Sequence, residues 1–472
     1  KSGSIDLPPI SELLVFTKPT SFQTLPPLTK SMDKVHRLTG KNQEWGDKGR
    51  QVIIGLDIGS TGSKAAAIDI DEGTALWDSW SRTLGNPVEA ARGLIDEFLK
   101  AHGHHADVIS IGVTGSGRQI VGSLAASAMN ASQVFIMNEI AAHAAGAVYW
   151  DPEVDTIFEL GGQDAKYIRL EDGRVVDAAM NEACSAGTGS FIEEQGQCFE
   201  NINDVKEMGR LALQADHVVS LGQHCSVFMA EVIEQAMAAG RETKAILAGL
   251  YDSVISNYLN RVKGNRPVGK KVFCQGMPFS SDALAAAVAR QTGQTVIVPP
   301  NPGTIGAVGI ALLAREQLDV KAEPLQLESF LKAKVVKRDT FTCKSTKGCG
   351  EPGNKCQIDR LVTDVAGIRG NFTWGGSCSL YDKTAGRNKL PNKAPDPTKE
   401  REELARDIYA KVQEPDGEDA KGIIALTDVF ELKSLAPFFA SFVRALGFEP
   451  MVFTEANQRI LRKGIEISEV PW

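Results

Sequence analysis

Two stretches of the chain share a pattern that few folds accommodate. They read IIGLDIGSTGSKAAAIDIDEG at 53–73 and TIFELGGQDAKYIRLEDG at 156–173. Each has an apolar strand that ends in an acid, then a glycine turn, a lysine and a second strand. The acids Asp57 and Glu159 are 102 residues apart, and so are Lys64 and Lys166. Two matching hairpins at this separation predict two related lobes that face each other.

Hairpins of this kind suit phosphate binding. Gly59 in the first turn and Gly161 and Gly162 in the second let backbone N–H groups approach anionic oxygens. The hydroxyls of Ser60 and Thr61 add donors. An acid at a strand end, here Asp57, can hold Mg²⁺ through its waters. Glycine and serine turns after an aspartate are common, so the paired hairpins, more than either alone, predict a nucleotide site.

A third element follows later in the chain. The segment KKVFCQGMPFSSDALAAAVARQTG at 270–293 predicts a strand, a glycine turn and a helix, and TVIVPPNPGTIGAVGIALLA follows at 295–314. In this order the three elements resemble the actin, hexokinase and heat-shock-chaperone ATPase superfamily. The resemblance implies an α/β, two-lobed, ribonuclease-H-like fold with ATP between the lobes. It places Gly276 and the segment from Gly303 to Gly306 on the adenosine side, where Met277 departs from the usual second glycine.

The length and composition predict several parts and exclude some partners. At 472 residues one core is not expected. We expect a linker at 1–50, the two-lobed domain at 51–318, a Cys-rich segment at 319–400, and a linker helix with a partial βαβ unit at 401–472. The net charge of −8 argues against a nucleic-acid partner. No apolar run is long enough to span a membrane, no secretory signal is recognisable, and the eight cysteines favour a reducing cytoplasm.

Two cysteine motifs narrow the resemblance. NEACSAGTGSF contains Cys184, and CSVFMAEVI begins at Cys225. Together with LDIGSTGSKAA, GVTGSGR, NEIAAHAAGA, ELGGQDAK and NPGTIGAVGIALL, they resemble the ATP-dependent activators of 2-hydroxyacyl-CoA dehydratases and the related ATPase subunits of benzoyl-CoA reductases. This resemblance covers about 52–317.

The resemblance implies that Cys184 and Cys225 bind one [4Fe-4S] cluster shared by two subunits. The residues agree with this, since a cubane needs four thiolates and two per chain require a two-fold axis. Each cysteine also precedes an expected helix, whose positive end favours a thiolate. The alternative from the residues alone is that both are small buried core residues.

The activity implied by the family is ATP hydrolysis coupled to transfer of one low-potential electron. Asp57 would hold the metal and its waters, Gln163 would position the attacking water, and Asp164 is a second candidate for that role. Lys64 and Lys166 would neutralise phosphate charge, with ordinary surface lysines at strand ends as the alternative. The implied partners are a second copy of the chain, an iron–sulfur dehydratase or reductase that acts on acyl-CoA thioesters, and a donor such as ferredoxin or flavodoxin.

Four more cysteines lie in the third region, at Cys343, Cys349, Cys356 and Cys378. A short, glycine-rich segment with little core is typical of a part that a metal holds together. The gaps of five, six and twenty-one residues lack the two-residue spacing of zinc ribbons. We expect a second metal site here, an iron–sulfur cluster in preference to zinc, with the absence of metal as the alternative.

Two other functions are compatible with parts of the sequence. A small-molecule kinase of the same superfamily needs a carboxylate base in the cleft, which Asp164 could supply, but it gives the two cysteine motifs no role. A non-catalytic dimer module would need the cluster only, and the intact turns at 57–61 and 161–164 argue against it. The start at Lys1 and the single strand–helix–strand unit after residue 420 predict a piece of a longer, multi-domain protein.

Overall fold

The protein is represented by a computed structural model that describes residues 22–40, 45, 49–181, 186–199, 202, 204–318, 322–346, 349, 353–381, 420–427 and 432–453, with single positions between 397 and 408 and at 463. The chain divides into two compact units, 1–387 and 388–472. Each unit is described by itself.

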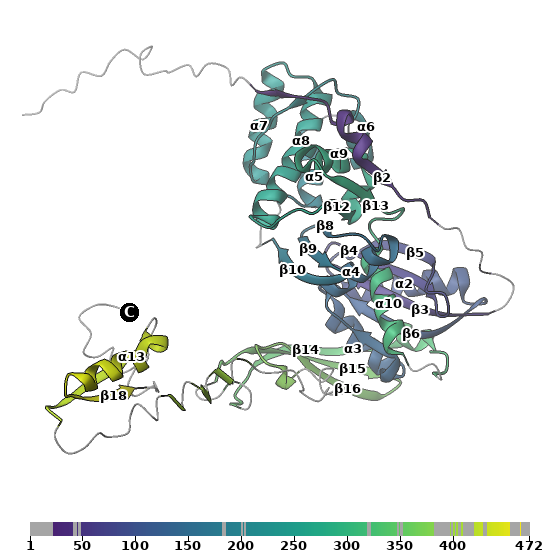
Figure 1. Cartoon of the computed structure of the whole chain (residues 1–472). Coiled ribbons are helices and arrows are strands. Elements are labelled where there is room, and N and C mark those ends of the chain that lie inside the picture. The colour runs from purple at the N-terminus through teal and green to yellow at the C-terminus, as the bar shows by residue number, and fades with distance from the viewer. Residues whose placement is uncertain are drawn as a thin grey trace, which may run out of the picture. The chain divides into compact units, whose positions relative to one another are not determined.

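The first lobe of the larger unit is built on a five-stranded sheet (Figure 1). Its strands, in spatial order, are β5 (Ala75–Arg82), β4 (Gly62–Asp69), β3 (Arg50–Ile58), β6 (Ala106–Thr114) and β7 (Val134–Ile136). Strands β3, β4 and β5 form an antiparallel meander, whereas β6 and β7 run parallel to β3. Helices α2 (Pro87–His102) and α3 (Arg118–Ala128) connect these strands.

Strand β3 shows why this sheet is buried on both faces. Val52, Ile54 and Leu56 pack in one core with residues of α2 and α3, while Ile53 belongs to a second core on the opposite face. Successive side chains of a strand point to opposite faces, so a strand covered on both sides reads as a continuous apolar run.

The second lobe is built on a six-stranded sheet. Its spatial order is β10 (Arg174–Met180), β9 (Ala165–Glu171), β8 (Thr156–Leu160), β12 (Lys271–Gln275), β13 (Thr295–Val298) and β2 (Val35–Arg37). The helices of this lobe are α5 (Gly189–Gly196), α6 (Val205–Ala212), α7 (Ser226–Ala238), α8 (Thr243–Tyr258) and α9 (Asp282–Thr292). The short strand β11 (Val218–Val219) lies between α6 and α7.

Two helices join the lobes, α4 (Glu139–Trp150) and α10 (Ile305–Gln317), which lie next to each other in Figure 1. Their backbones are in close contact, because a Cβ on Gly309 would stand 1.8 Å from the carbonyl oxygen of Ala142. Ala147 of α4 packs in a core with the second sheet, and Ala307 of α10 packs in a core with the first. The fold is therefore the two-lobed α/β architecture that the paired hairpins predict.

Part of the segment expected to be a linker is structured. Residues 24–25 form β1 (Thr24–Leu25), which pairs with β11, and β2 adds a parallel edge strand beside β13. A 3₁₀ helix, η1 (Leu28–Lys34), lies between them and buries Leu28 in the core of the second lobe. The guanidinium Nε of Arg37 lies 2.5 Å from a carboxylate oxygen of Asp282.

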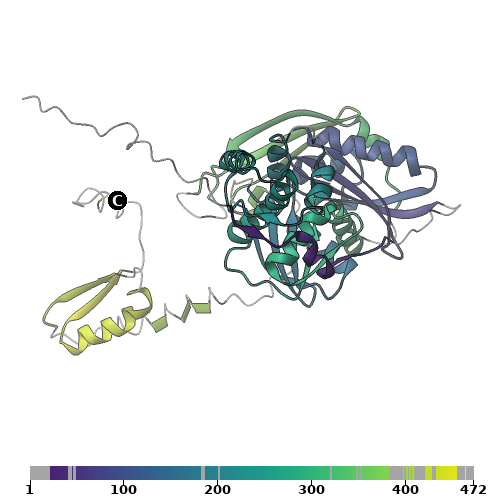
Figure 2. The same ribbon diagram turned by 90° about the horizontal axis from the view of Figure 1, so that it is seen from above.

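The Cys-rich segment forms a three-stranded antiparallel sheet, β14 (Lys334–Thr342), β15 (Gln357–Val365) and β16 (Ile368–Trp374). The short helix α11 (Leu327–Lys332) precedes it and packs in the core of the first lobe. The sheet lies beside the first lobe in both ribbon views (Figure 1 and Figure 2). The hydroxyls of Ser127 on α3 and Thr363 on β15 are 2.7 Å apart.

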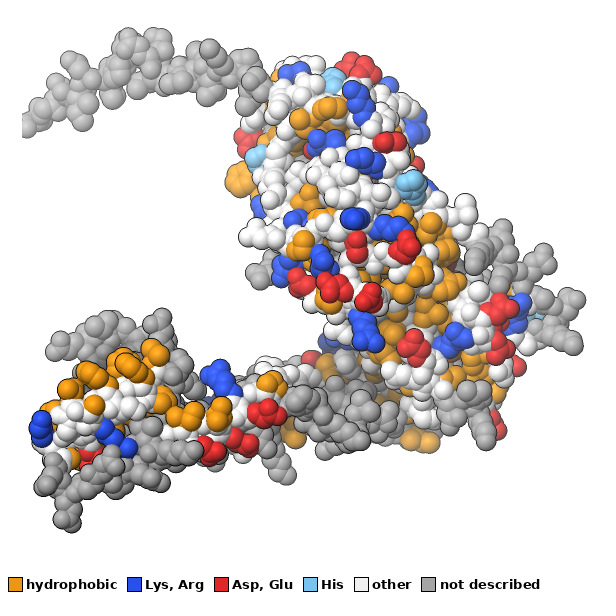
Figure 3. Space-filling view, in the orientation of Figure 1, with side chains coloured by type: hydrophobic (Ala, Val, Ile, Leu, Met, Phe, Trp, Pro, Cys, Tyr) orange, Lys and Arg blue, Asp and Glu red, His pale blue; other side chains and the backbone are white. Residues whose placement is uncertain are grey.

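The second unit contains β17 (Ile423–Thr427), α13 (Leu432–Ala445) and β18 (Glu449–Phe453). The two strands pair in parallel, so the predicted partial βαβ unit is confirmed. Apolar side chains gather on the face of this unit seen in Figure 3. Phe438 and Phe442 of α13 are 65% and 53% exposed.

Candidate nucleotide site and cysteine loops

The first hairpin places a buried carboxylate at its strand end. Asp57 is the second-last residue of β3 and is directly opposite Lys64 of β4 in the ladder. Their side chains form an ion pair with 3.6 Å between Nζ and Oδ2. Burial alone would raise the pKa of Asp57, but nearby cations, Lys64 foremost, outweigh it and hold the pKa below its ordinary value. Asp57 is therefore ionised at neutral pH, as a metal-binding carboxylate must be.

The second hairpin repeats this arrangement with a tighter ion pair. Glu159 of β8 is opposite Lys166 of β9, and the Lys166 ammonium donates to Glu159 Oε2 at 2.9 Å. The same ammonium lies 3.7 Å from Glu139 at the start of α4. Burial by itself would lower the pKa of Lys166, but the two glutamates outweigh it and raise the pKa. Lys166 is thus a buried structural cation.

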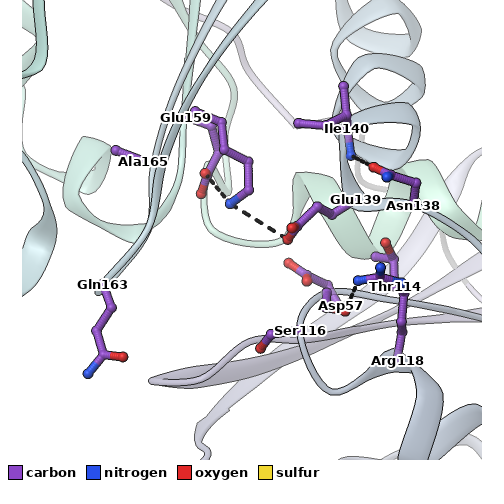
Figure 4. A network of polar contacts seen from close by, with 12 residues as sticks. Asp57, Thr114, Ser116, Arg118, Asn138, Glu139, Ile140, Glu159, Gln163 and Ala165 are labelled. Atoms are coloured by element: carbon purple, nitrogen blue, oxygen red, sulfur yellow. Dashed lines mark hydrogen bonds and ion pairs between the residues drawn. The ribbon is translucent and has the colours of Figure 1, made fainter. Parts of the chain in front are cut away.

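The two acids lie in one polar cluster between the lobes (Figure 4). Besides Asp57, Glu159, Lys166 and Glu139, this cluster includes the buried His143, one helical turn after Glu139. Burial lowers the pKa of His143, although the neighbouring carboxylates act in the opposite direction. Within the described residues, the Nδ1 atom of His143 has no hydrogen-bond partner.

Gly306 is required by this cluster. A Cβ at this position would stand 2.8 Å from Asp57 Oδ2 and 2.9 Å from His143 Cε1. Gly306, which the resemblance places on the adenosine side, therefore lies against the acid expected to hold the metal. The first turn of α10 thereby approaches the end of β3.

The two glycine turns meet across the cleft. A Cβ on Gly162 would stand 2.7 Å from both Cβ and Oγ1 of Thr61, so only glycine allows this approach. The Oγ1 atom of Thr61 is buried and has no partner among the described residues. The turns that contain Gly59, Ser60 and Thr61 and Gly161 and Gly162 thus face one another, as the sequence predicts.

The third glycine turn is held by the second sheet. Gly276 has φ +102°, and a Cβ there would stand 2.0 Å from the carbonyl oxygen of Leu160. Its N–H donates to the carbonyl of Pro302 at 2.6 Å. The next residue, Met277, packs on Gly303, where a Cβ would stand 2.3 Å from its sulfur. Gly276 and Gly303 therefore lie together, and the departure at Met277 fills the space beside them.

The residues expected to position water lie at the tip of the second hairpin. Gln163 is exposed and extends apart from the Asp57–Glu159 cluster in Figure 4. Asp164 is half-buried, and its carbonyl accepts the N–H of Gly161 at 2.8 Å. Their roles stay predictions.

Of the two motif cysteines, the structure describes Cys225, and Cys184 lies outside the described residues. Cys225 is the residue before α7 and is half-buried. Val227 and Phe228, two and three residues after Cys225 in the first turn of that helix, are 76% and 62% exposed. Cys225 thus lies at a helix start within an apolar surface.

Both sides of the Cys184 loop are hydrogen-bonded to the second nucleotide hairpin. Before the loop, Asn181 accepts the N–H of Ala165 on Oδ1 at 2.8 Å and donates from Nδ2 to the carbonyl of Gln163 at 3.0 Å. After it, the N–H of Gly189 donates to the carbonyl of Gly161, and the N–H of Ser190 to that of Gly162, each at 2.9 Å. Described residues before and after Cys184 are therefore bonded to residues 161–165.

Several residues of this site were not assigned from the sequence. The sequence indicates Glu159 only as the repeat of Asp57, and it predicts a phosphate contact for Lys166, whose ammonium is paired with Glu159 and Glu139 in the structure. Glu139 and His143 lie in the motif NEIAAHAAGA, and their spacing of four puts them on one helix face, which is a usable signal. No local sequence pattern indicates the contacts of Asn181, because they depend on how the strands of the hairpin pair.

The facing hairpins, the bridging helices α4 and α10 and the turn at Gly276 define a two-lobed ATPase of the actin and hexokinase type. A sequence profile of the BadF/BadG/BcrA/BcrD ATPase family matches residues 54–314. The chain belongs to this family, and the family resemblance drawn from the cysteine motifs is confirmed.

Individual relatives agree with this assignment. The chain is 31% identical over 266 residues to the 2-hydroxyisocaproyl-CoA dehydratase activator of Clostridioides difficile, which covers 56% of this chain and 95% of the relative. It is 32% identical to the activator of lactoyl-CoA dehydratase of Anaerotignum propionicum, with 57% and 99% covered. The solved component A of the (R)-2-hydroxyglutaryl-CoA dehydratase of Acidaminococcus fermentans superposes with a TM-score of 0.50 at 26% identity, with 56% and 98% covered.

Among the helices in the described ranges, none is both long enough and apolar enough to cross a membrane.

Proposed function

We propose that this chain is an ATP-hydrolysing iron–sulfur electron donor that reduces and activates a partner dehydratase or reductase acting on acyl-CoA thioesters. The observation that carries the proposal is the attachment of the Cys184 loop to the hairpin at 161–165. A change in that hairpin is transmitted directly to a residue expected to bind the cluster. The names of the activator relatives support the same role.

The nucleotide would lie between the two glycine turns. Gly59, Ser60, Thr61, Gly161 and Gly162 would surround its phosphates, with Gly276 and Gly303 on the adenosine side. The ionised Asp57 suits Mg²⁺ and its waters, and Gly306 keeps the space beside it open. Lys64 would shift between Asp57 and phosphate charge when nucleotide binds.

Attack on the γ-phosphate needs a positioned water. Gln163, with Asp164 as the second candidate, extends from a turn whose backbone is fixed by Asn181. Loss of the γ-phosphate would change the contacts of this turn, which is the kind of event that switches loops in other nucleotide hydrolases. Because the turn and the Cys184 loop share hydrogen bonds, the loop would move with it.

The second cysteine is linked to the first by a helix contact. Gln195 of α5 donates from Nε2 to the carbonyl of Ser226, the residue after Cys225, at 2.9 Å. Helix α5 begins at Gly189 and is bonded to Gly161. A displacement of the second hairpin therefore reaches both cysteine positions through α5.

The donor set around Cys225 fits a shared cluster. Its thiol stands at the N-terminal end of α7, and the exposed Val227 and Phe228 close to it offer apolar area to a second subunit. We propose that Cys184 and Cys225 of each of two copies hold one [4Fe-4S] cluster. Such a cluster supplies one low-potential electron when bound.

The remaining partners follow from this chemistry. The electron would come from a low-potential donor such as ferredoxin or flavodoxin and would pass to an iron–sulfur acceptor. A thiolate-bound cluster requires a reducing compartment, so we place the protein in the cytoplasm.

The proposal is tested by purifying the full chain without oxygen and measuring its iron, its subunit number and its ATPase activity. We expect a dimer that hydrolyses ATP and has a brown iron–sulfur spectrum. Cys184→Ala and Cys225→Ala should each abolish that spectrum. The matched control Cys198→Ala should keep the spectrum, since Cys198 belongs to neither motif. An iron-free protein that phosphorylates a sugar or an acid would instead establish a kinase.

A further inference from the structure

The four cysteines of the third region gather at one end of the three-stranded sheet. Cys343 follows β14 directly, and Cys356 precedes β15. The N–H of Cys343 donates to the carbonyl of Cys356 at 2.8 Å, which continues the β14–β15 ladder by one pair. Residues opposite each other in an antiparallel pair point to the same face, so these two thiols are neighbours.

The other two cysteines are brought to this pair by turns. The sulfurs of Cys349 and Cys343 lie 3.9 Å and 3.8 Å from the same carbonyl oxygen, that of Ser345. The backbone N–H of Ser377, next to Cys378, donates to the sulfur of Cys356 at 3.5 Å.

The turn before Ser377 requires glycine. Gly375 and Gly376 have φ +97° and +88°, and a Cβ on Gly376 would stand 3.4 Å from Cys356 Cβ. These glycines let the end of β16 wrap around the Cys356 thiol.

All four thiols line a single pocket. Its other lining residues are Ser345, Asn354, Lys355, Ile358, Gly375, Gly376, Ser377, Leu380 and Tyr381. Among these described lining residues there is no carboxylate and no histidine, so sulfur is the donor that the pocket offers to an ion. Lys355 is the charged lining residue, and its sign suits an anionic thiolate centre.

This end of the sheet has little apolar core of its own. Most residues of β14 are exposed, and the buried apolar positions nearby are Ile358 and Leu361. The opposite end of the sheet is different, because Thr363 is bonded to Ser127 of the first lobe. A small element without a core is commonly held by a metal or by disulfides, and all four of these cysteines are free thiols in this structure.

We propose that Cys343, Cys349, Cys356 and Cys378 hold a second metal centre, an iron–sulfur cluster with four thiolate ligands from one chain. In the described part of the chain, no three His, Cys, Asp or Glu side chains stand close enough together to hold an ion. A single Zn²⁺ needs all four sulfurs about 2.3 Å from one point. Sulfurs that line one pocket but lie farther apart than the ligands of a single zinc ion can each bind an iron atom of an inorganic core between them.

The test uses the full chain with Cys184→Ala and Cys225→Ala, which removes the ligands proposed for the shared cluster. Iron bound by this double variant then reports on the four-cysteine site alone, whether or not the shared cluster exists. Purified and reconstituted without oxygen, this double variant should retain about four iron and four sulfide per chain, as one cubane requires. Adding Cys349→Ser and Cys378→Ser should remove that iron, whereas adding Cys198→Ser should not. Iron, sulfide and zinc are measured together on each protein.

Two results would overturn this assignment. The first is a double variant that takes up no iron while circular dichroism shows a folded protein. The second is one zinc per chain, bound by the double variant and lost when Cys349 and Cys378 are also replaced. For every variant, circular dichroism and urea unfolding compared with the parent show whether the protein is folded.

Discussion

The backbone N–H of Gly189 donates to the carbonyl of Gly161 at 2.9 Å, which joins the start of α5 to the turn expected to contact the γ-phosphate. On the other side of the Cys184 loop, Asn181 makes the matching contacts with Ala165 and Gln163. The proposed function therefore requires nucleotide state and the position of Cys184 to be coupled through residues 161–165.

Asn181→Ala should uncouple hydrolysis from electron transfer. The variant loses the side-chain bonds to the hairpin but leaves the phosphate-binding backbone in place. We expect ATP hydrolysis within about threefold of the parent and ATP-dependent reduction of the acceptor lowered by tenfold or more, the size of a typical coupling free energy. The two rates are measured on the same preparation.

The control for that variant is Asn260→Ala, which removes an exposed side-chain bond to the carbonyl of Ser256 in the last turn of α8. It should change neither rate. Equal losses of both rates in Asn181→Ala would show that the residue supports the nucleotide site only.

Replacing Lys166 should destabilise the protein strongly. Lys166→Met leaves the buried Glu159 and its neighbour Glu139 without their shared cation. Removing one partner of a buried ion pair typically costs about 3–5 kcal/mol in the free energy of unfolding. Urea-induced unfolding followed by circular dichroism measures this loss, and the exposed Lys244→Met should stay within about 0.5 kcal/mol of the parent.

The buried His143 predicts a pH dependence of stability. Its pKa is lowered from 6.5 by burial, so below that pH the unfolded chain binds a proton that the folded chain does not. The groups around it are Asp57, Glu159, Lys166 and Glu139. The contribution of the neutral imidazole to the free energy of unfolding is present above pH 6.5. Below that pH the free energy of unfolding falls, by up to about 1.4 kcal/mol per pH unit.

The measurement is urea unfolding at several pH values between 7.5 and 5 on the parent and on His143→Gln, whose slope should be flatter, roughly by one proton. The exposed His104→Gln serves as the comparison and should keep the parent slope. A His143→Gln slope equal to that of the parent would contradict a neutral, buried imidazole.

Gly306→Ala should impair nucleotide binding. The added Cβ would stand 2.8 Å from Asp57 Oδ2 and 2.9 Å from His143 Cε1, so the carboxylate must move. We expect the affinity for ATP with Mg²⁺ to fall by about tenfold or more, which corresponds to about 1.4 kcal/mol. Gly93→Ala on α2, where a Cβ meets nothing within 4 Å, should leave calorimetric affinity unchanged.

The parts that the sequence predicts best are those with local patterns. The hairpins at 53–73 and 156–173, the turn at Gly276 and the strand–helix–strand unit after residue 420 each depend on residues that are close along the chain. Glu139 and His143 join the acids only because α4 lies between the two sheets, which no short pattern reports. The edge strand β2 pairs with β13 across more than 250 residues, so its composition reads as a linker.

The central claim is that ATP hydrolysis opens the path of one electron from the cluster to a partner. Anaerobic stopped-flow mixing of the reduced protein with an iron–sulfur dehydratase of a close relative tests it most directly, with cluster oxidation followed by its visible absorbance. We expect rapid oxidation with ATP and Mg²⁺, none on that timescale with ADP, and oxidation at least about tenfold slower with the Asn181→Ala variant. Equal oxidation rates with ATP and ADP would contradict it.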